Sequence, residues 1–226
     1  GIFCLKVKLS GINIDWDVAR TKAVAEVAHE VLKEKGRERF FLSVDSNEMN
    51  RSPEDTLEYL RKLRRASPLA FNSLLYIEQP TERDLHRHMF SMRKVSEIKP
   101  VLADEGVTDL ESFDLALKLG WSGVAVKACK WHTSSLLYIS KMEHLGISYS
   151  IQDLTCPGLA LIHSASLAAR SNPIKGFEYN ARQYRPVAYP EIQKRHETLF
   201  KVKDGMVSTE SLQPIGLGFS VEGWKP

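Results

Sequence analysis

The sequence predicts an α/β fold built from seven successive βα units. Short apolar runs alternate along the chain with longer stretches of helical periodicity, which is the pattern of parallel strands joined by helices. At 226 residues, with 43% apolar and 26% charged residues, the chain is long enough to bury a substantial core. Seven parallel strands with intervening helices fit either an open doubly wound sheet or most of a (β/α)₈ barrel.

The seven predicted strands are short apolar runs, most of them bounded by polar residues or glycine. They cover residues 2–9, 40–44, 74–77, 101–103, 123–126, 148–151 and 174–179. In a barrel, the carboxyl ends of parallel strands meet at one face, where (β/α)₈ enzymes carry their reactive groups. The polar residues that follow these runs are therefore the first candidates for a functional site.

Helical periodicity fills the intervals between the strands. The helix predicted over residues 15–36 begins at an N-cap of Asp15 or Asp17 and ends at Gly36. Its expected inward stripe consists of Val18, Ala23, Val24, Val27, Ala28 and Val31. Ser52 before Pro53 predicts the start of the next helix.

Later segments repeat the scheme. Helices are predicted over residues 109–119, 134–145 and 159–170. No internal repeat, low-complexity tract or linker marks a second folded domain. Residues 1–186 are predicted to form the barrel domain, and residues 187–226 a C-terminal tail that packs on the barrel or on a capping region.

Charge and composition exclude several classes of protein. The 31 Lys and Arg residues nearly balance 28 Asp and Glu, so the net charge of +3 offers no basic footprint for nucleic acid. No apolar run reaches the about 18 residues that a membrane span needs, and no basic segment precedes an apolar one at the N-terminus. We expect no membrane association and a cytoplasmic location.

The three cysteines, Cys4, Cys129 and Cys156, show no paired spacing and no clustered histidines. This pattern disfavours both a disulfide framework and a structural zinc site. The cysteines are interpreted as reduced, mostly buried thiols.

Carboxylates follow three consecutive predicted strands. Asp45, Glu78 and Asp104 come directly after apolar runs, so in a barrel they converge on one side of its mouth. Three carboxylates that close repel one another unless a cation lies among them. Oxygen ligands without Cys or His favour a hard ion, and the pattern predicts Mg²⁺, with Mn²⁺ as a possible substitute.

Lysines flank these carboxylates in strand order. Alternation along the first strand places Lys6 and Lys8 on one face, with Val7 on the other. Each ammonium group makes its neighbour easier to deprotonate, so the lysine nearer the strand end is a candidate general base. Lys127 follows the fifth predicted strand, on the far side of the carboxylates.

Taken together, these residues resemble the C-terminal barrel of the enolase superfamily, of the mandelate racemase and muconate lactonizing type. The branch they resemble most contains muconate lactonizing enzymes, dipeptide epimerases and succinylbenzoate synthases. The matching pieces, in chain order, are Leu5-Lys6-Val7-Lys8, Val44-Asp45-Ser46-Asn47, Ile77-Glu78-Gln79-Pro80, Ala103-Asp104-Glu105-Gly106, Val126-Lys127 and Gly216-Leu217-Gly218. The combination is specific because of the order of the pieces and because the strand-end pieces follow strand-like runs.

The resemblance assigns roles to individual residues. It implies that Asp45, Glu78 and Asp104 bind the metal ion, and that Lys8 and Lys127 are acid/base groups on opposite faces of the substrate. Lys6 would assist Lys8 and help to neutralise the intermediate. The residues expected beside the metal ligands or at the substrate are Asn47, Glu105, Asp153, Glu178 and Asn180.

The chemistry that the resemblance implies is removal of a proton next to a carboxylate, through an enediolate intermediate. The product would come from racemisation or epimerisation, cycloisomerisation or dehydration of a small carboxylic acid. Glu178-Tyr179-Asn180 stands where dipeptide epimerases of this family carry Asp-x-Asp, which disfavours a dipeptide substrate. The alternatives are a Schiff-base barrel enzyme with Lys127 as nucleophile, and a catalytically inactive binding or scaffold protein.

Members of this family also carry an N-terminal capping domain and a barrel strand ahead of the Lys-x-Lys strand. Neither is found in this sequence, which therefore predicts a (β/α)₈-type barrel without its first strand and its cap. An open sheet edge exposes unpaired backbone groups. We expect a missing N-terminal segment or a partner chain to close the barrel, and a homo-oligomeric assembly.

Overall fold

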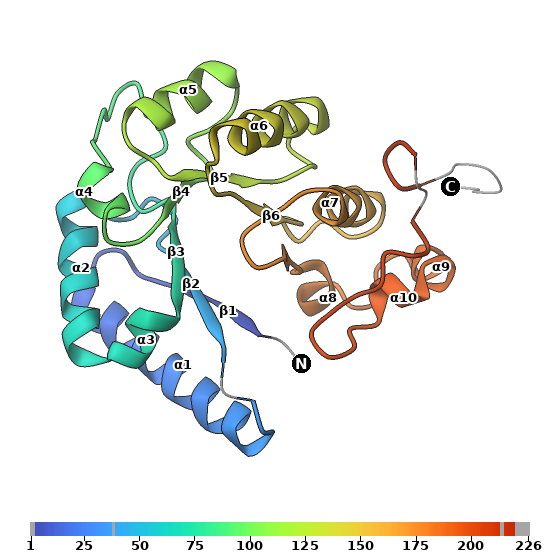
Figure 1. Cartoon of the computed structure of the whole chain (residues 1–226), viewed down its shortest axis with the longest axis horizontal. Coiled ribbons are helices and arrows are strands. Elements are labelled where there is room, and N and C mark those ends of the chain that lie inside the picture. Colours follow the sequence, from blue (N-terminus) through green and yellow to red (C-terminus); the bar gives the residue numbers. More distant parts are fainter. Residues whose placement is uncertain (1–2, 38, 213–214, 220–226) are drawn as a thin grey trace. The chain divides into compact units, whose positions relative to one another are not determined.

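The computed structural model is an α/β protein in which the paired strands within each part of the chain run parallel, and it describes residues 3–37, 39–212 and 215–219 (Figure 1). The chain divides into two compact units, Phe3–Ala125 and the later part that begins at Val126. They are called the first and the second unit below. The boundary predicted at residue 186 stays a prediction.

The strands of the first unit lie side by side in chain order, β1-β2-β3-β4-β5. Their bounds are Cys4–Lys8 (β1), Phe41–Asp45 (β2), Leu74–Glu78 (β3), Val101–Ala103 (β4) and Gly123–Val126 (β5). The five predicted strands are confirmed, with ends that differ by two residues or fewer where they are described. Ile2, included in the first prediction, lies outside the described residues.

Helices connect these strands, and α1, α2 and α3 pack against one another beside β1 to β3 (Figure 1). Their bounds are Ile14–Glu34 (α1), Pro53–Ala66 (α2), Pro68–Ser73 (α3), Arg93–Ser96 (α4) and Leu110–Lys118 (α5). Ser52 precedes α2 and Pro53 is its first residue, as predicted, although the Ser52 side chain makes no capping hydrogen bond. A helix with proline at this position loses no intrahelical hydrogen bond.

Two expectations for α1 are wrong. Its N-cap is Asn13, whose side chain accepts a hydrogen bond from Trp16 N, and not Asp15 or Asp17. Asp17 is buried instead and accepts from the backbone N–H groups of Ser10 and Gly11 at 2.6 and 3.0 Å. The predicted apolar stripe is displaced around the helix, because Val27 is 60% exposed while Thr21 is fully buried.

The second unit contains a pair of short parallel strands and five helices among its described residues. Their bounds are His132–Leu145 (α6), Ser150–Gln152 (β6), Leu159–Ala169 (α7), Phe177–Glu178 (β7), Ala181–Tyr184 (α8), Pro190–Arg195 (α9) and Glu197–Phe200 (α10). Leu161 and Ile162 of α7 form a buried cluster with Ile192, Leu199 and Phe200 of the two last helices. The predicted C-terminal tail thus contains helices that pack on α7.

The cysteines are free, as expected, but not mostly buried: Cys129 is exposed, and Cys4 and Cys156 are partly exposed. Across the described residues, we find no helix that combines the length and the apolar character needed to cross a bilayer.

Candidate active site

Parallel register in the first unit brings charged side chains to one level at the ends of three strands. Lys8 pairs with Asp45 between β1 and β2, and Asp45 pairs with Glu78 between β2 and β3. Because successive strand residues point to opposite faces, Lys6 lies on the same face as Lys8, while Val7 is buried on the other face. The predicted Lys-x-Lys arrangement is therefore present, with both lysines next to carboxylates.

Lys6 holds two buried carboxylates together. Its ammonium group donates to Glu78 Oε1 at 2.7 Å and lies 3.5 Å from Asp45 Oδ2. The side chains of Asp45 and Glu78 are each only 1% exposed. Burying two carboxylates side by side is unfavourable unless positive charge compensates them. Lys6 supplies that charge, so this side chain has an electrostatic role in the fold as well as a candidate role in chemistry.

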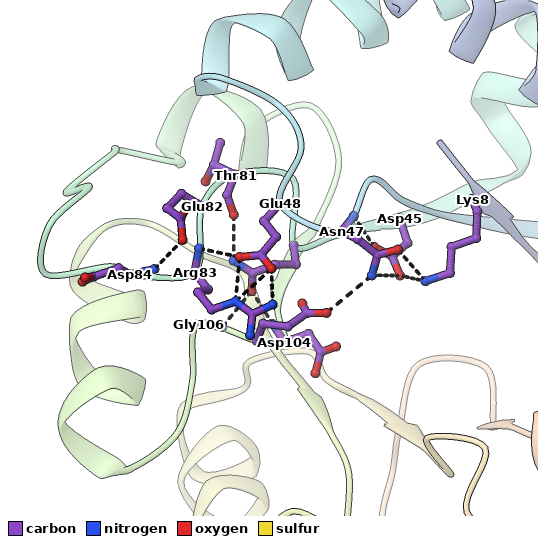
Figure 2. Close-up of polar contacts among 12 residues, drawn as sticks. Lys8, Asp45, Asn47, Glu48, Thr81, Glu82, Arg83, Asp84, Asp104 and Gly106 are labelled. Carbon is purple, nitrogen blue, oxygen red and sulfur yellow. Dashed lines mark hydrogen bonds and ion pairs between the residues drawn. The ribbon is translucent and has the colours of Figure 1, made fainter. Parts of the chain in front are cut away.

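Lys8 reaches the same cluster from the solvent side. Its ammonium group forms an ion pair with Asp45 and donates to Asn47 Oδ1 at 3.0 Å (Figure 2). The Lys8 side chain is 54% exposed, whereas that of Lys6 is 15% exposed. A group that exchanges protons with a diffusing substrate has to be reachable, and of these two lysines Lys8 meets that requirement better.

Asn47 orders the turn that follows β2. Its backbone N–H donates to Asp45 Oδ1 at 2.8 Å, and its side-chain amide lies within 3.4 Å of both Asp45 Oδ2 and Glu105 Oε1. Its φ of 45° is left-handed, a conformation that asparagine tolerates better than most residues. The predicted site residue Asn47 thus contacts Asp45, and the predicted residue Glu105 contacts Asn47.

Asp104, the third predicted metal ligand, is also buried, and it follows β4. Figure 2 shows it beside Gly106 and Arg83, while Lys8, Asn47 and Asp45 gather apart from it. Within the described ranges, no three His, Cys, Asp or Glu side chains are grouped so that they could hold a metal ion as they stand. The metal site therefore stays a prediction.

The donor chemistry nevertheless fits a hard divalent cation. Asp45, Glu78 and Asp104 are buried carboxylates that follow or end three adjacent strands, and two of them already bind a cationic group, the ammonium of Lys6. Oxygen ligands of this kind are those that Mg²⁺ prefers.

Sequence reasoning missed three residues that connect the loops at these strand ends. Glu48 forms a bidentate ion pair with Arg83 and also accepts from the Arg83 backbone N–H at 3.0 Å (Figure 2). These bonds hold the pKa of Glu48 below its usual range. The side chain of Gln79 bonds to the Asp104 loop. Partners 35 residues apart carry no local signal, and only the motif Glu78-Gln79-Pro80 pointed to the region.

In the second unit, the predicted residue Lys127 directly follows β5 and is 5% exposed. Its carbonyl accepts from Lys130 N at 3.0 Å, which closes a turn after the strand. This burial is consistent with an inward-facing lysine at the end of a strand.

Asp153 is fully buried and bonds to the backbone of two loops. Its Oδ1 accepts from Thr155 N at 2.7 Å and its Oδ2 from Ala181 N at 2.6 Å. Burial is the main reason why the pKa of Asp153 is raised, and the charge of nearby Glu178 adds to it. Both oxygens thus help to join the loops after β6 and β7. The predicted place of Asp153 beside the metal ligands or at the substrate stays a prediction.

Glu178 and Asn180, the last predicted residues, contact each other at the end of β7. The Asn180 amide donates to Glu178 Oε1 at 2.7 Å, and both residues are partly exposed. They are the predicted residues of the second unit that a ligand can reach most easily.

A cysteine nucleophile is not supported by the second unit. Although the residue as a whole is exposed, partial loss of hydration at its thiol and the nearby Cys156 thiol raise the pKa of Cys129 to about 11. Because the thiolate is the reactive form, a thiol with this pKa is a poor nucleophile near neutral pH.

Comparison with models of protein families identifies one family. The family model described as "Enolase C-terminal domain-like" matches residues 1–224. No curated protein matches the chain in sequence.

Solved structures similar to the chain have the same type of fold. A mandelate racemase/muconate lactonizing protein from Herpetosiphon aurantiacus is 23% identical with a TM-score of 0.66, over 81% of this chain and 48% of that one. N-succinyl Arg/Lys racemase from Bacillus cereus is 22% identical with a TM-score of 0.64, over 81% and 46%. L-Ala-D/L-Glu epimerase from Bacillus subtilis is 20% identical with a TM-score of 0.61, over 81% and 48%. The chain thus spans about half the length of these proteins.

Proposed function

Because the chain belongs to the enolase C-terminal domain-like family, we propose that it removes a proton next to the carboxylate of a small carboxylic acid. The proposed centre of this reaction is the strand-end cluster of the first unit, which consists of Lys6, Lys8, Asp45 and Glu78. The outcome is racemisation or epimerisation, cycloisomerisation or dehydration, and the substrate class is a carboxylate without a dipeptide backbone.

The observation that carries the proposal is the pairing of Lys8 and Lys6 with buried carboxylates at the ends of β2 and β3. Lys8 is the solvent-accessible member, with its ammonium group bound to Asp45 and Asn47. It is the proposed acid/base group, because once deprotonated it can accept a proton from a substrate in the open part of the site. Lys6 stays between Asp45 and Glu78, where its positive charge favours a developing anion.

Asp45, Glu78 and Asp104 are the residues proposed to hold Mg²⁺, or Mn²⁺ in its place. When bound, the ion supplies positive charge that a carboxylate substrate needs before the neighbouring carbon acid can lose its proton. The three side chains contribute the matching negative charge. Asn47 keeps Asp45 in place through its backbone N–H group.

Lys127 is proposed as the second acid/base group. Its place after β5 and its burial support the assignment. Two lysines that both exchange protons allow inversion at the reacting carbon, whereas one lysine that acts only by its charge allows elimination or cycloisomerisation. Glu178 and Asn180 are the proposed substrate-contacting side chains of the second unit.

Proton exchange tests this function. The protein is incubated in D₂O with Mg²⁺ and a panel of chiral carboxylic acids, and the hydrogen next to each carboxylate is followed by NMR. We expect exchange with at least one acid, and its loss in Lys8→Met but not in Lys62→Met, a variant of a partly exposed lysine on α2 that pairs with Asp15 and Glu58. Exchange that persists in Lys8→Met would contradict the assignment of Lys8.

Two other functions give different results with the same protein. A Schiff-base enzyme that uses Lys127 would be trapped covalently by borohydride in the presence of a carbonyl substrate, and Lys127→Met would abolish the adduct. A scaffold or binding protein would show neither exchange nor heat of Mg²⁺ binding in calorimetry.

A further inference from the structure

Gln79 occupies an unusual position directly after β3. It is fully buried, and its φ of 29° lies in the left-handed region that side chains other than glycine and asparagine rarely adopt. Strained backbone of this kind persists only where surrounding contacts hold it in place. The contacts of Gln79 therefore indicate which parts of the structure the strained conformation holds together.

The side-chain amide of Gln79 bonds to two loops. Its Oε1 accepts from the backbone N–H groups of Asp104 at 2.7 Å and Gly106 at 3.1 Å. Its Nε2 donates to the carbonyl of Thr81 at 2.9 Å. The loop after β4, which begins with a predicted metal ligand, is thereby fixed to the loop after β3 (Figure 2).

The backbone of Gln79 adds two further connections. Its N–H donates to Leu102 O of β4 at 2.9 Å, and its carbonyl accepts from Glu48 N in the turn after β2 at 2.7 Å. One residue thus bonds to the segments that follow β2, β3 and β4, the three strands whose ends provide Asp45, Glu78 and Asp104.

We propose that Gln79 is a positioning residue that holds the Asp104 loop against the ends of β2 and β3. The inference rests on the proposed function, because it gives Asp104 its role as a metal ligand. Gln79 acts on Asp104 through the backbone and makes no contact with a reacting group. A side chain without an acceptor at this position leaves two buried N–H groups without their partner.

Other side chains replace the amide only in part. Asparagine is one methylene shorter, and glutamate lacks the donor for Thr81 O while adding negative charge near Glu48 and Asp104. Methionine matches the length and volume of glutamine but removes the hydrogen bonds, so Gln79→Met is the variant that isolates them.

Asn50 offers a matched control. It is also a buried amide of the first unit, with Nδ2 donating to Gly11 O and Oδ1 accepting from Ser46 Oγ, both at 2.9 Å. Its side chain bonds to none of the three carboxylates proposed to bind the metal ion. Asn50→Leu therefore removes comparable hydrogen bonds without releasing the Asp104 loop.

Two readouts on the full chain test the proposal. In amide hydrogen exchange followed by NMR, we expect Gln79→Met to lose protection at Asp104 and Gly106, while Asn50→Leu retains it. In calorimetry with Mg²⁺ alone, we expect Gln79→Met to bind about 10- to 100-fold more weakly than the wild type, and Asn50→Leu to bind like it.

Unchanged protection at Asp104 and Gly106 in folded Gln79→Met would overturn the proposal, and so would equal Mg²⁺ affinity in both variants. If the wild type bound no Mg²⁺, the proposed function would fail, while the exchange experiment would still decide whether Gln79 holds the loop. Should Gln79→Met fail to fold, Gln79→Glu keeps the acceptor and the same measurements apply: we expect protection at Asp104 and Gly106 to be retained, and its loss would overturn the proposal.

Discussion

Buried carboxylates at strand ends have different partners in the two units. In the first unit, Asp45 and Glu78 bind the ammonium group of Lys6, and Asp45 also binds that of Lys8. In the second unit, the equally buried Asp153 binds the backbone N–H groups of Thr155 and Ala181.

We propose that this difference separates a chemical role for Asp45 and Glu78 from a structural role for Asp153. Asp45 accepts one backbone N–H bond, from Asn47 to Oδ1, and its Oδ2 pairs with the two ammonium groups, which another cation can replace. A carboxylate such as Asp153, whose two oxygens both accept backbone N–H bonds, cannot leave them without exposing unsatisfied groups. In the sequence both Asp45 and Asp153 come at the end of a predicted strand, and the resemblance assigned Asp45 to the metal ion and Asp153 to the surroundings of the ligands or the substrate. The identity of the partner distinguishes them.

The largest expected effect concerns catalysis in the first unit. Lys8→Met is expected to slow exchange of the substrate proton by about 10²- to 10⁴-fold, the usual contribution of general acid–base catalysis. The fold should be retained, because the Lys8 side chain is more than half exposed. NMR exchange rates measured beside circular dichroism spectra check both statements.

A smaller effect is expected in the second unit. There we predict that Asp153→Ala lowers stability and leaves metal binding unchanged. Asp153→Ala leaves the N–H groups of Thr155 and Ala181 without their acceptor, which is expected to reduce the free energy of unfolding by about 2 kcal/mol. Urea unfolding measures this change. A variant as stable as the wild type would show that these two hydrogen bonds do not hold the loops together.

The smallest effects are opposite responses to pH. The pKa of Glu48 is lowered by Arg83, so its contribution to stability is present above the unfolded pKa and is lost as pH falls through the folded one. The pKa of Asp153 is raised, so its contribution is present below the unfolded pKa and is lost as pH rises through the folded one.

Unfolding free energies of the wild type, Glu48→Gln and Asp153→Asn between pH 3 and pH 7 test these signs. As pH rises, the free energy of unfolding of the wild type should increase relative to that of Glu48→Gln. Over the same range it should decrease relative to that of Asp153→Asn. Parallel curves for all three proteins would show that neither carboxyl group is linked to folding.

The sequence contained most of what determines the fold. Apolar runs bounded by polar residues predicted the strands, and alternation placed Lys6 and Lys8 on one face. The face of α1 was predicted less well, because valine at a helical interval does not reveal whether another element covers it, and Val27 is exposed. Asn13 competes with two nearby aspartates for the same capping position, and sequence alone does not decide between them.

The site was predictable only in part. Charged residues after strands pointed to Asp45 and Glu78, whose neighbouring positions follow from parallel register. Gln79 and the Glu48–Arg83 pair were missed because their contacts depend on loop conformations with positive φ, which no periodicity encodes. The structural use of Asp153 was missed for the same reason.

Calorimetric titration with Mg²⁺ tests the central claim most directly, in the wild type, Asp104→Asn and Asp153→Asn. We predict binding to the wild type, the same affinity in Asp153→Asn, and loss of binding in Asp104→Asn. Equal binding by all three proteins, or loss in Asp153→Asn alone, would contradict the claim that the first-unit carboxylates form the cation site.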